Sequence, residues 1–122
     1  MAAALPLLSD AAFVQQVRQM LLRPACVHAT FSGADERLAA ILYRRGITLV
    51  NLQRAIWFGC ARKYIALLNG AEKAPMLVNS LHYFSGLVEE VAELSVGEDY
   101  WKHVRHKMTQ LERMWSNRTP GR

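Results

Sequence analysis

The stretch TLVNLQRAIWFGCARKYIALLN, residues 48–69, sets the architecture of this chain. It contains no proline, and apolar residues recur along it with the three- and four-residue spacing of a helix. The apolar residues that share one face are Leu52, Ala55, Ile56, Gly59, Cys60 and Leu67. Thr48 is a suitable N-cap, and Gly70 follows as a stop signal. The pattern predicts one long central helix.

Four further segments flank this helix, at about residues 11–22, 32–45, 80–94 and 98–115, and each has an apolar stripe of helical period. The stripes include Phe13, Val17 and Leu21, then Leu38, Ile41 and Leu42, then Leu81, Phe84, Leu87, Val88, Val91 and Leu94, and finally Trp101, Val104, Met108, Leu111 and Trp115. Ser9 or Asp10 is expected to cap the first segment, Ser32 with Asp35 the second, and Asn79 or Ser80 the fourth. Residues 25–31 are expected to form a loop with some buried side chains.

We therefore expect an all-α protein in which five helices form one compact bundle. A single helical domain should cover residues 1–115, because 122 residues with 52% apolar content fit one packed core. The end of the chain, residues 116–122, is polar, basic and interrupted by Pro120, so it is expected to be a flexible tail.

The sequence predicts a soluble, cytoplasmic protein with no membrane partner. The apolar start, Met1 to Leu8, lacks a basic leader and is shorter than the core of a signal peptide. No uncharged apolar stretch reaches the roughly 18 residues that a membrane span needs. Cys26 and Cys60 have no metal-ligand spacing, and both are expected to be free thiols in a reducing compartment.

Charged residues are distributed unevenly along the chain. From Arg37 to Ala71 there are six basic residues and no acidic one. From Lys102 to the end of the chain there are six more basic residues and one acidic residue, Glu112. Half of all the carboxylates lie between these regions, in Glu89, Glu90, Glu93, Glu98 and Asp99. This distribution predicts a basic face that binds an anion and an acidic face that contacts a protein or a second copy of the chain.

Residues 36–63 have the pattern of a helix-turn-helix: a helix that ends on Gly46, a short turn and a second helix. Asn51, Gln53 and Arg54 would then face a DNA major groove, since amide and guanidinium groups pair with base edges. Phosphates would be bound by Arg44, Arg45, Arg62 and Lys63. The alternative is a plain corner between two helices, because the second helix is longer and more apolar than an ordinary recognition helix.

Aromatic and basic side chains alternate on the central helix. Trp57 and Tyr64 lie on a side distinct from Leu52 and Ile56, near Arg54, Arg62 and Lys63, where they can stack bases along a single strand. Packing of these rings against the first or fifth helix is the alternative. A second basic surface is expected on the fifth helix, from Lys102, Arg105, Lys107 and Arg113.

No catalytic residue, metal ligand or cofactor site is predicted. His103 and His106 are three residues apart on one helix, but a third metal ligand in phase is missing, so they are expected only to add charge as the pH falls. Glu89 and Glu90 point about 100° apart on a helix and form no acid–base dyad. The glycine-rich phosphate loop, the Gly-x-Ser-x-Gly elbow and the His-Glu-x-x-His motif do not occur. We therefore expect a non-enzymatic protein.

The motifs GITLV at 46–50, AI at 55–56 and NSLHYF at 79–84, with residues 87–91, are similar to a helical module of DNA-replication proteins. The chain resembles the DnaD-like domains and related modules of plasmid and phage replication proteins over about residues 36–92. There, a glycine-ended helix, a helix of small apolar residues and a Ser-Leu-x-Tyr helix start follow in that order. A Tyr-x-x-x-Ile-x-x-x-Trp signature after Tyr83 does not occur. The resemblance implies nucleic-acid-associated work in replication or mobile elements and assigns no role to a residue.

The sequence thus predicts a non-enzymatic nucleic-acid-binding accessory protein of a replication or mobile-element system, which binds DNA or RNA through a basic face on its second and third helices. Two other classes stay open. One is a small structural subunit of a larger nucleoprotein assembly, and the other is a helical adaptor that binds only proteins. Salt dependence separates them, because nucleic-acid binding weakens steeply with salt.

Overall fold

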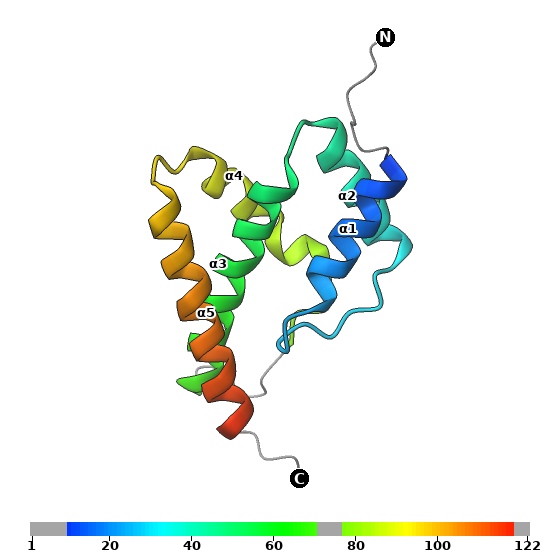
Figure 1. Cartoon of the computed structure of the whole chain (residues 1–122). Coiled ribbons are helices and arrows are strands. Elements are labelled where there is room, and N and C mark those ends of the chain that lie inside the picture. The colour runs from blue at the N-terminus through cyan, green and yellow to red at the C-terminus, as the bar shows by residue number, and fades with distance from the viewer. Residues whose placement is uncertain (1–9, 71–76, 119–122) are drawn as a thin grey trace.

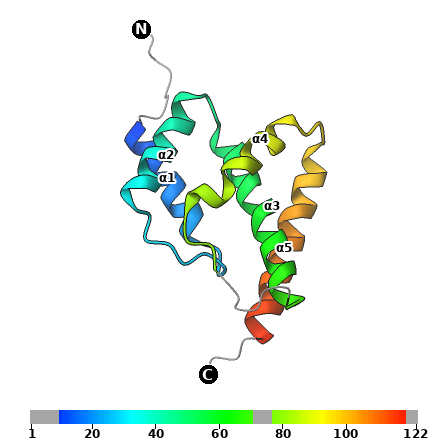
Figure 2. The same cartoon turned by 180° about the vertical axis from the view of Figure 1, so that it is seen from behind.

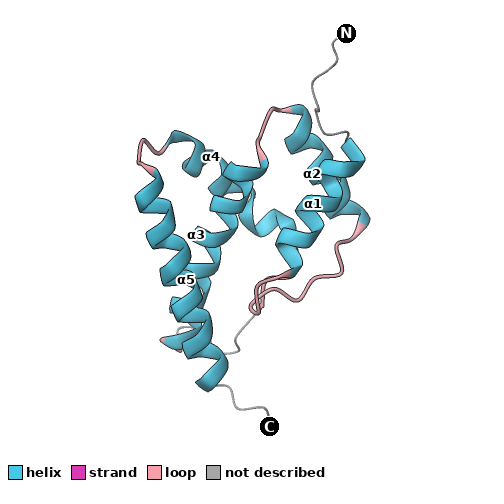
Figure 3. Cartoon of the chain, in the orientation of Figure 1, coloured by secondary structure: helices cyan, strands magenta, loops and turns pink. Residues whose placement is uncertain are grey.

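The computed structural model describes residues 10–70 and 77–118 (Figure 1). In chain order the elements are α1 (Asp10–Leu22), α2 (Gly33–Arg44), α3 (Leu49–Leu68), the short 3-10 helix η2 (Leu81–Phe84), α4 (Ser85–Glu93) and α5 (Glu98–Arg118). In this part of the chain there is no strand, and one isolated parallel bridge joins Val27 to Val78 (Figure 3). The predicted all-α bundle of five helices is confirmed. Within the described ranges, no helix has the length and apolar character needed to cross a membrane.

The central element of the bundle is α3. It lies side by side with α5, and it also packs against α4 and α1 (Figures 1 and 2). All six residues predicted for its apolar face are buried, and Leu52, Ile56 and Cys60 have no exposed surface. By contrast, α2 packs chiefly against α1 and η2. The long central helix therefore contacts α1, α4 and α5 directly, as its predicted central place requires, while α2 joins the bundle through α1 and η2.

Short-range hydrogen bonds and one glycine fix both ends of α2 and the start of α3. Ser32 Oγ accepts from the Asp35 amide at 3.3 Å while Asp35 Oδ2 accepts from the Ser32 amide, which is a complete capping box. Gly46 has a φ of 86° at the end of α2, a conformation that glycine adopts without steric cost. Thr48 Oγ1 accepts from the Asn51 amide at 3.1 Å and caps α3. These predicted helix ends are confirmed.

Asp35 also joins α2 to η2. Its side chain is only 1% exposed, and its Oδ1 accepts from Ser80 Oγ at 2.8 Å and from the Leu81 amide at 3.0 Å. A buried carboxylate is tolerated only when hydrogen bonds satisfy its oxygens. This one receives donors from the first residues of two helices, so it holds the start of α2 against the start of η2.

Gly59 allows α3 to approach η2 and α4 closely. A Cβ atom at this position would lie 2.7 Å from the Phe84 ring and 2.8 Å from the Leu87 side chain. Both neighbours are themselves buried, so neither has free space into which to move. The missing side chain therefore sets the distance between these elements.

The fourth helical segment differs from its prediction. The expected helix from Ser80 to Leu94 begins instead as the 3-10 turn η2, and α4 starts at Ser85. Asp35 and the Ser80 hydroxyl together hold the first amides of η2, which fixes this tighter turn. Because α4 ends at Glu93, Leu94 lies outside the helix and is 40% exposed, although it was predicted to belong to the buried stripe.

Two further predictions need correction. The helix α5 runs through Arg118, so the tail predicted from residue 116 begins too early; the first proline after Trp115 is Pro120. Ile41 is 46% exposed, because Ala39 and Leu42 occupy the buried face of α2. The predictions for residues 1–9, including Ser9 as a cap, and for residues 119–122 lie outside the described residues. Cys26 and Cys60 are buried free thiols, as expected.

The substitution Gly59→Ala should lower the free energy of unfolding by about 1–3 kcal/mol, because one added methyl group overpacks the contact with Phe84 and Leu87. The same exchange inside an unobstructed helix usually stabilises by roughly 0.5–1 kcal/mol. Gly86→Ala in α4 is the matched control, since its Cβ would meet no atom within 4 Å. Urea unfolding followed by circular dichroism measures both. A Gly59→Ala variant as stable as the control would contradict the packing described here.

Candidate nucleic-acid interface

A groove runs between α3 and α5. One hollow of about 380 Å³ lies between their N-terminal turns, and a second of about 360 Å³ extends from the middle of both helices to the end of α1. Both volumes lie in the range of roughly 300–1,000 Å³ that is usual for small-ligand sites. Gln53, Trp57 and Arg105 line both hollows. The two hollows therefore adjoin at these three residues, and together they are called the groove.

The wall that α5 contributes is basic. Lys102, Arg105 and Thr109 recur at spacings of three and four residues, so they lie on one face of the helix, and His106 lines a hollow together with them. Arg23, just after α1, lines the opposite end of the groove. Across residues 10–70 and 77–118, Lys102, Arg105 and Arg23 have no carboxylate within 4.0 Å.

Trp57 forms the floor of the groove where the two hollows meet. Its ring is partly buried, and the guanidinium carbon of Arg105 lies 5.5 Å from the ring centroid. This is the distance of a cation–π interaction. Gln53, one turn earlier on α3, adds an amide to the same wall. The groove thus combines an aromatic surface with a cation and a hydrogen-bonding group.

Arg54 closes the end of the groove nearest the α4–α5 loop. Its Nη2 donates to Glu98 Oε2 at 2.6 Å, and its guanidinium lies 5.2 Å from the Trp101 ring centroid. The side chain is only 16% exposed. Since Glu98 balances the charge of Arg54, the positive charge of the groove comes from Lys102, Arg105 and Arg23.

The residues predicted as a nucleic-acid site fall into two groups. The groove brings together Gln53, Arg54, Trp57 and Lys102. The residues that do not line it are Arg44, Arg45, Asn51, Arg62, Lys63 and Lys107. The central helix therefore contributes to the groove from one side only.

The arginines outside the groove lie against carboxylates. Arg44 Nε is 4.0 Å from Asp10, Arg45 is paired with Glu89, and Arg62 Nη2 is 3.6 Å from Glu90. Arg62 also lies 4.4 Å from the Phe58 ring centroid, and Lys63 lies 6.0 Å from that of Tyr83. The expected separation of a basic face from an acidic face is therefore wrong, because the fold places the acids of α4 beside the arginines of α2 and α3.

The corner of residues 36–63 directs two of its three predicted base-reading residues, Gln53 and Arg54, towards α5. Gln53 and Arg54 lie against α5, and α5 covers this side of α3. A recognition helix must enter a major groove about 12 Å wide with such side chains leading. Of the two interpretations drawn from the sequence, this arrangement favours the plain helical corner.

The sequence did not predict that two residues of the groove, Arg105 and Arg23, lie near Trp57. Arg105 was expected only in a separate basic surface, and Arg23 carries no sequence signal. Their positions along the chain are far from Trp57, so only the packing of α1 and α5 on α3 brings them together. Tyr64, in contrast, is completely buried and bonded to Glu112 of α5, which agrees with the alternative that its ring packs against another helix.

The Tyr64 hydroxyl connects the three segments that form the groove. Its Oη donates to Glu112 Oε2 at 2.7 Å and accepts from the Cys26 amide at 3.0 Å. The same Glu112 oxygen accepts from the Ala25 amide at 2.7 Å. Through these bonds α3 is tied to α5 and to the loop after α1, and Glu112 lines the same hollow as Arg23 and Arg105.

Burial shifts the acidity of this cluster. Removal of the phenol from water, and then its hydrogen bond to Glu112, raise the pKa of Tyr64. Contact with the Cys26 thiol, and then burial, raise the pKa of Cys60 as well. Both groups are therefore neutral in the folded protein at neutral pH, and ionising either one costs stability.

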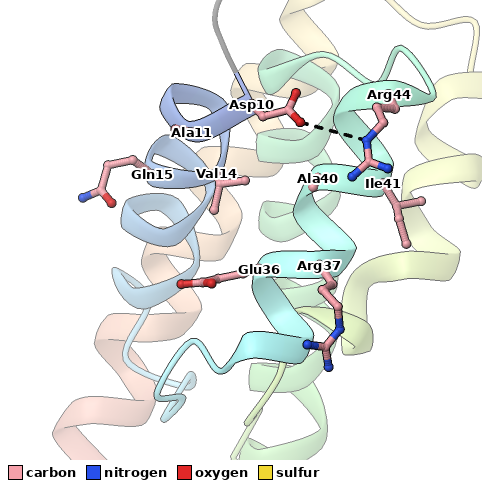
Figure 4. Close-up of a pocket in the computed structure, with 9 residues that line it drawn as sticks. All are labelled: Asp10, Ala11, Val14, Gln15, Glu36, Arg37, Ala40, Ile41 and Arg44. Atoms are coloured by element: carbon pink, nitrogen blue, oxygen red, sulfur yellow. Dashed lines mark ion pairs between the residues drawn. The ribbon is translucent and has the colours of Figure 1, made fainter.

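A larger hollow of about 680 Å³ lies between α1 and α2 (Figure 4). Its apolar floor comes from small and aliphatic residues, while Asp10 faces Arg44 across its upper end and Glu36 and Arg37 extend at its lower end. Gln15 points away from it. Acidic and basic side chains alternate around this hollow, so it lacks the single sign of charge that attracts an anion.

Ser80, His82 and Asp35 have the side chains of a hydrolytic triad, but their geometry is that of a helix cap. Ser80 Oγ donates to Asp35, accepts from the His82 amide at 3.1 Å and lies 3.0 Å from His82 Nδ1. Asp35 lies 3.7 Å from the same Nδ1. A proton relay needs the two nitrogens of the ring to face different partners. In the described ranges, no three metal-binding side chains gather at one point, and His103 and His106 acquire no third ligand.

Comparison with known proteins gives no further guide: no family model, curated protein or solved structure matches the chain.

Tyr64→Phe should lower the free energy of unfolding by about 1–3 kcal/mol near pH 7, because the Cys26 amide loses its acceptor and Glu112 loses one of its two donors. A free tyrosine has a pKa of about 10. Above that pH the unfolded wild type loses its phenolic proton while the folded state keeps it, so its stability falls as the pH rises. The difference in free energy of unfolding between wild type and variant should therefore narrow above about pH 10. Urea unfolding from neutral to alkaline pH measures it, and a constant difference would contradict the raised pKa.

Proposed function

We propose that this protein is a non-enzymatic nucleic-acid-binding protein that holds its ligand in the groove between α3 and α5. The observation that carries the proposal is the contact of Arg105 with Trp57 in an open groove that Lys102 and Arg23 also line. Cations without carboxylate partners bind phosphates, and an exposed aromatic surface binds bases. The amide of Gln53 supplies a further hydrogen-bonding group.

The charge balance around the groove supports this choice of surface. Arg44, Arg45 and Arg62 lie against Asp10, Glu89 and Glu90, and Arg54 lies against Glu98. Among the described residues, no carboxylate lies within 4.0 Å of Lys102 or Arg105 on α5. The local excess of positive charge therefore lies along α5. Counterion release on binding a polyanion is strongest where such unpaired cations lie together.

The biological setting that we propose is a replication or mobile-element system in the cytoplasm. It rests on the resemblance of residues 36–92 to DnaD-like modules.

A protein-binding role is the second candidate, and exposed apolar side chains favour it. Val50, Leu94, Val96 and Tyr100 are 39–56% exposed, and all lie at the end of the bundle that the α4–α5 loop forms with the start of α3. Exposed apolar groups that lie together often contact a partner. A nucleoprotein subunit would use both this end and the groove, whereas an adaptor would use only the apolar end.

The double substitution Lys102→Ala/Arg105→Ala should weaken nucleic-acid binding and flatten its salt dependence. The slope of log K against log salt should fall by roughly 1.5, the sum for two lost phosphate contacts. The matched control is Arg45→Ala/Arg62→Ala, which removes the same charge from cations already paired with Glu89 and Glu90. It should change the slope little.

Fluorescence anisotropy with labelled strands and duplexes, over a range of salt concentrations, measures both variants. If the wild type binds no oligonucleotide even at low salt, the nucleic-acid function falls and the adaptor takes its place. If only the control variant loses binding, the protein binds nucleic acid through a surface other than the groove.

A further inference from the structure

Trp57 is more exposed than Trp101. Trp101 is 3% exposed and belongs to the core, whereas Trp57 is partly exposed at the point where the two hollows of the groove meet. A partly exposed indole at the floor of a groove is unfavourable in water unless something covers it. In the free protein the Arg105 guanidinium lies over it.

A ligand can displace the Arg105 side chain from the Trp57 ring. The side chain is exposed, and among the described residues no carboxylate holds its charge. A nucleobase stacks on an indole more strongly than an exposed guanidinium does. A displaced guanidinium would stay within reach of the same site, where the phosphate next to the stacked base is the natural partner. One nucleotide ligand can therefore stack a base on Trp57 and place a phosphate beside Arg105.

From these contacts we infer that the groove binds single-stranded nucleic acid, with one base stacked on Trp57 and the adjoining phosphate on Arg105. The inference rests on the proposed function and adds the class of ligand to it. In a duplex the base faces are covered by neighbouring pairs, so only edges and phosphates are available to a protein. An aromatic floor set between α3 and α5 can reach a base face only when the strand is unpaired.

Lys102 and Arg23 give the strand a path along the groove. Lys102 lies beside the hollow at the start of α5, and Arg23 beside the hollow at the end of α1, on either side of Trp57. The backbone of a strand that stacks one base on Trp57 would meet a cation in both directions. Site sizes of a few nucleotides are usual for such grooves.

The test uses four ligands with the full-length protein: a short labelled single strand as DNA, the same sequence as RNA, its duplex, and an abasic strand of equal length. The abasic strand keeps the phosphates and has no base to stack. Wild type should bind either single strand more tightly than the duplex or the abasic strand. Trp57→Leu should weaken single-strand binding roughly 5- to 150-fold, the usual effect of losing one stacked base, and should leave abasic binding unchanged.

Trp57→Phe is the matched variant, because it keeps a smaller ring that can stack, and its affinity should lie between those of wild type and Trp57→Leu. Circular dichroism checks that each variant is folded. Binding of the single strand should also quench tryptophan emission in wild type and much less in Trp57→Phe. Equal affinity for strand and duplex, or an equal loss of strand and abasic binding in Trp57→Leu, would overturn the stacking inference and leave the proposed function standing. Binding of none of the four ligands would overturn both.

Discussion

The groove depends on one buried hydroxyl group. Tyr64 bonds to Glu112 of α5 and to the Cys26 amide in the loop after α1, and these two segments with α3 are the walls on which Arg105, Arg23 and Trp57 lie. A buried phenol in an apolar core requires partners for its oxygen. Those partners come from parts of the chain that are distant in sequence, so satisfying Tyr64 also fixes the shape of the groove.

The parts of the fold that could be predicted are those that local sequence determines. Ser32, Asp35, Gly46 and Thr48 act on residues only a few positions away, and their caps appear where the sequence places them. The 3-10 turn before α4 could not be predicted in this way. It depends on Asp35, which lies 45 positions from Ser80, and hydrophobic period does not report such a contact.

The candidate site was predictable only in its residue types. The alternation of Trp57 with basic residues pointed to the side of α3 that lines the groove, while Arg45, Arg62 and Arg54 were expected to act as free cations. Each of these arginines lies beside a glutamate that is distant along the chain: Arg45 and Arg54 are both 44 positions from their partners. A run of residues with one sign of charge therefore does not predict the charge of the folded surface, because folding brings runs of opposite sign together.

The carboxylate of Asp35 also sets an order of events during synthesis. Its partners Ser80 and Leu81 leave the ribosome long after α1 and α2 are complete. Until then the charge has no buried donors beyond its own capping box, and it must stay hydrated. The start of α2 therefore cannot complete its contact with η2 until residues 80 and 81 have been made, although α1 and α2 are made first.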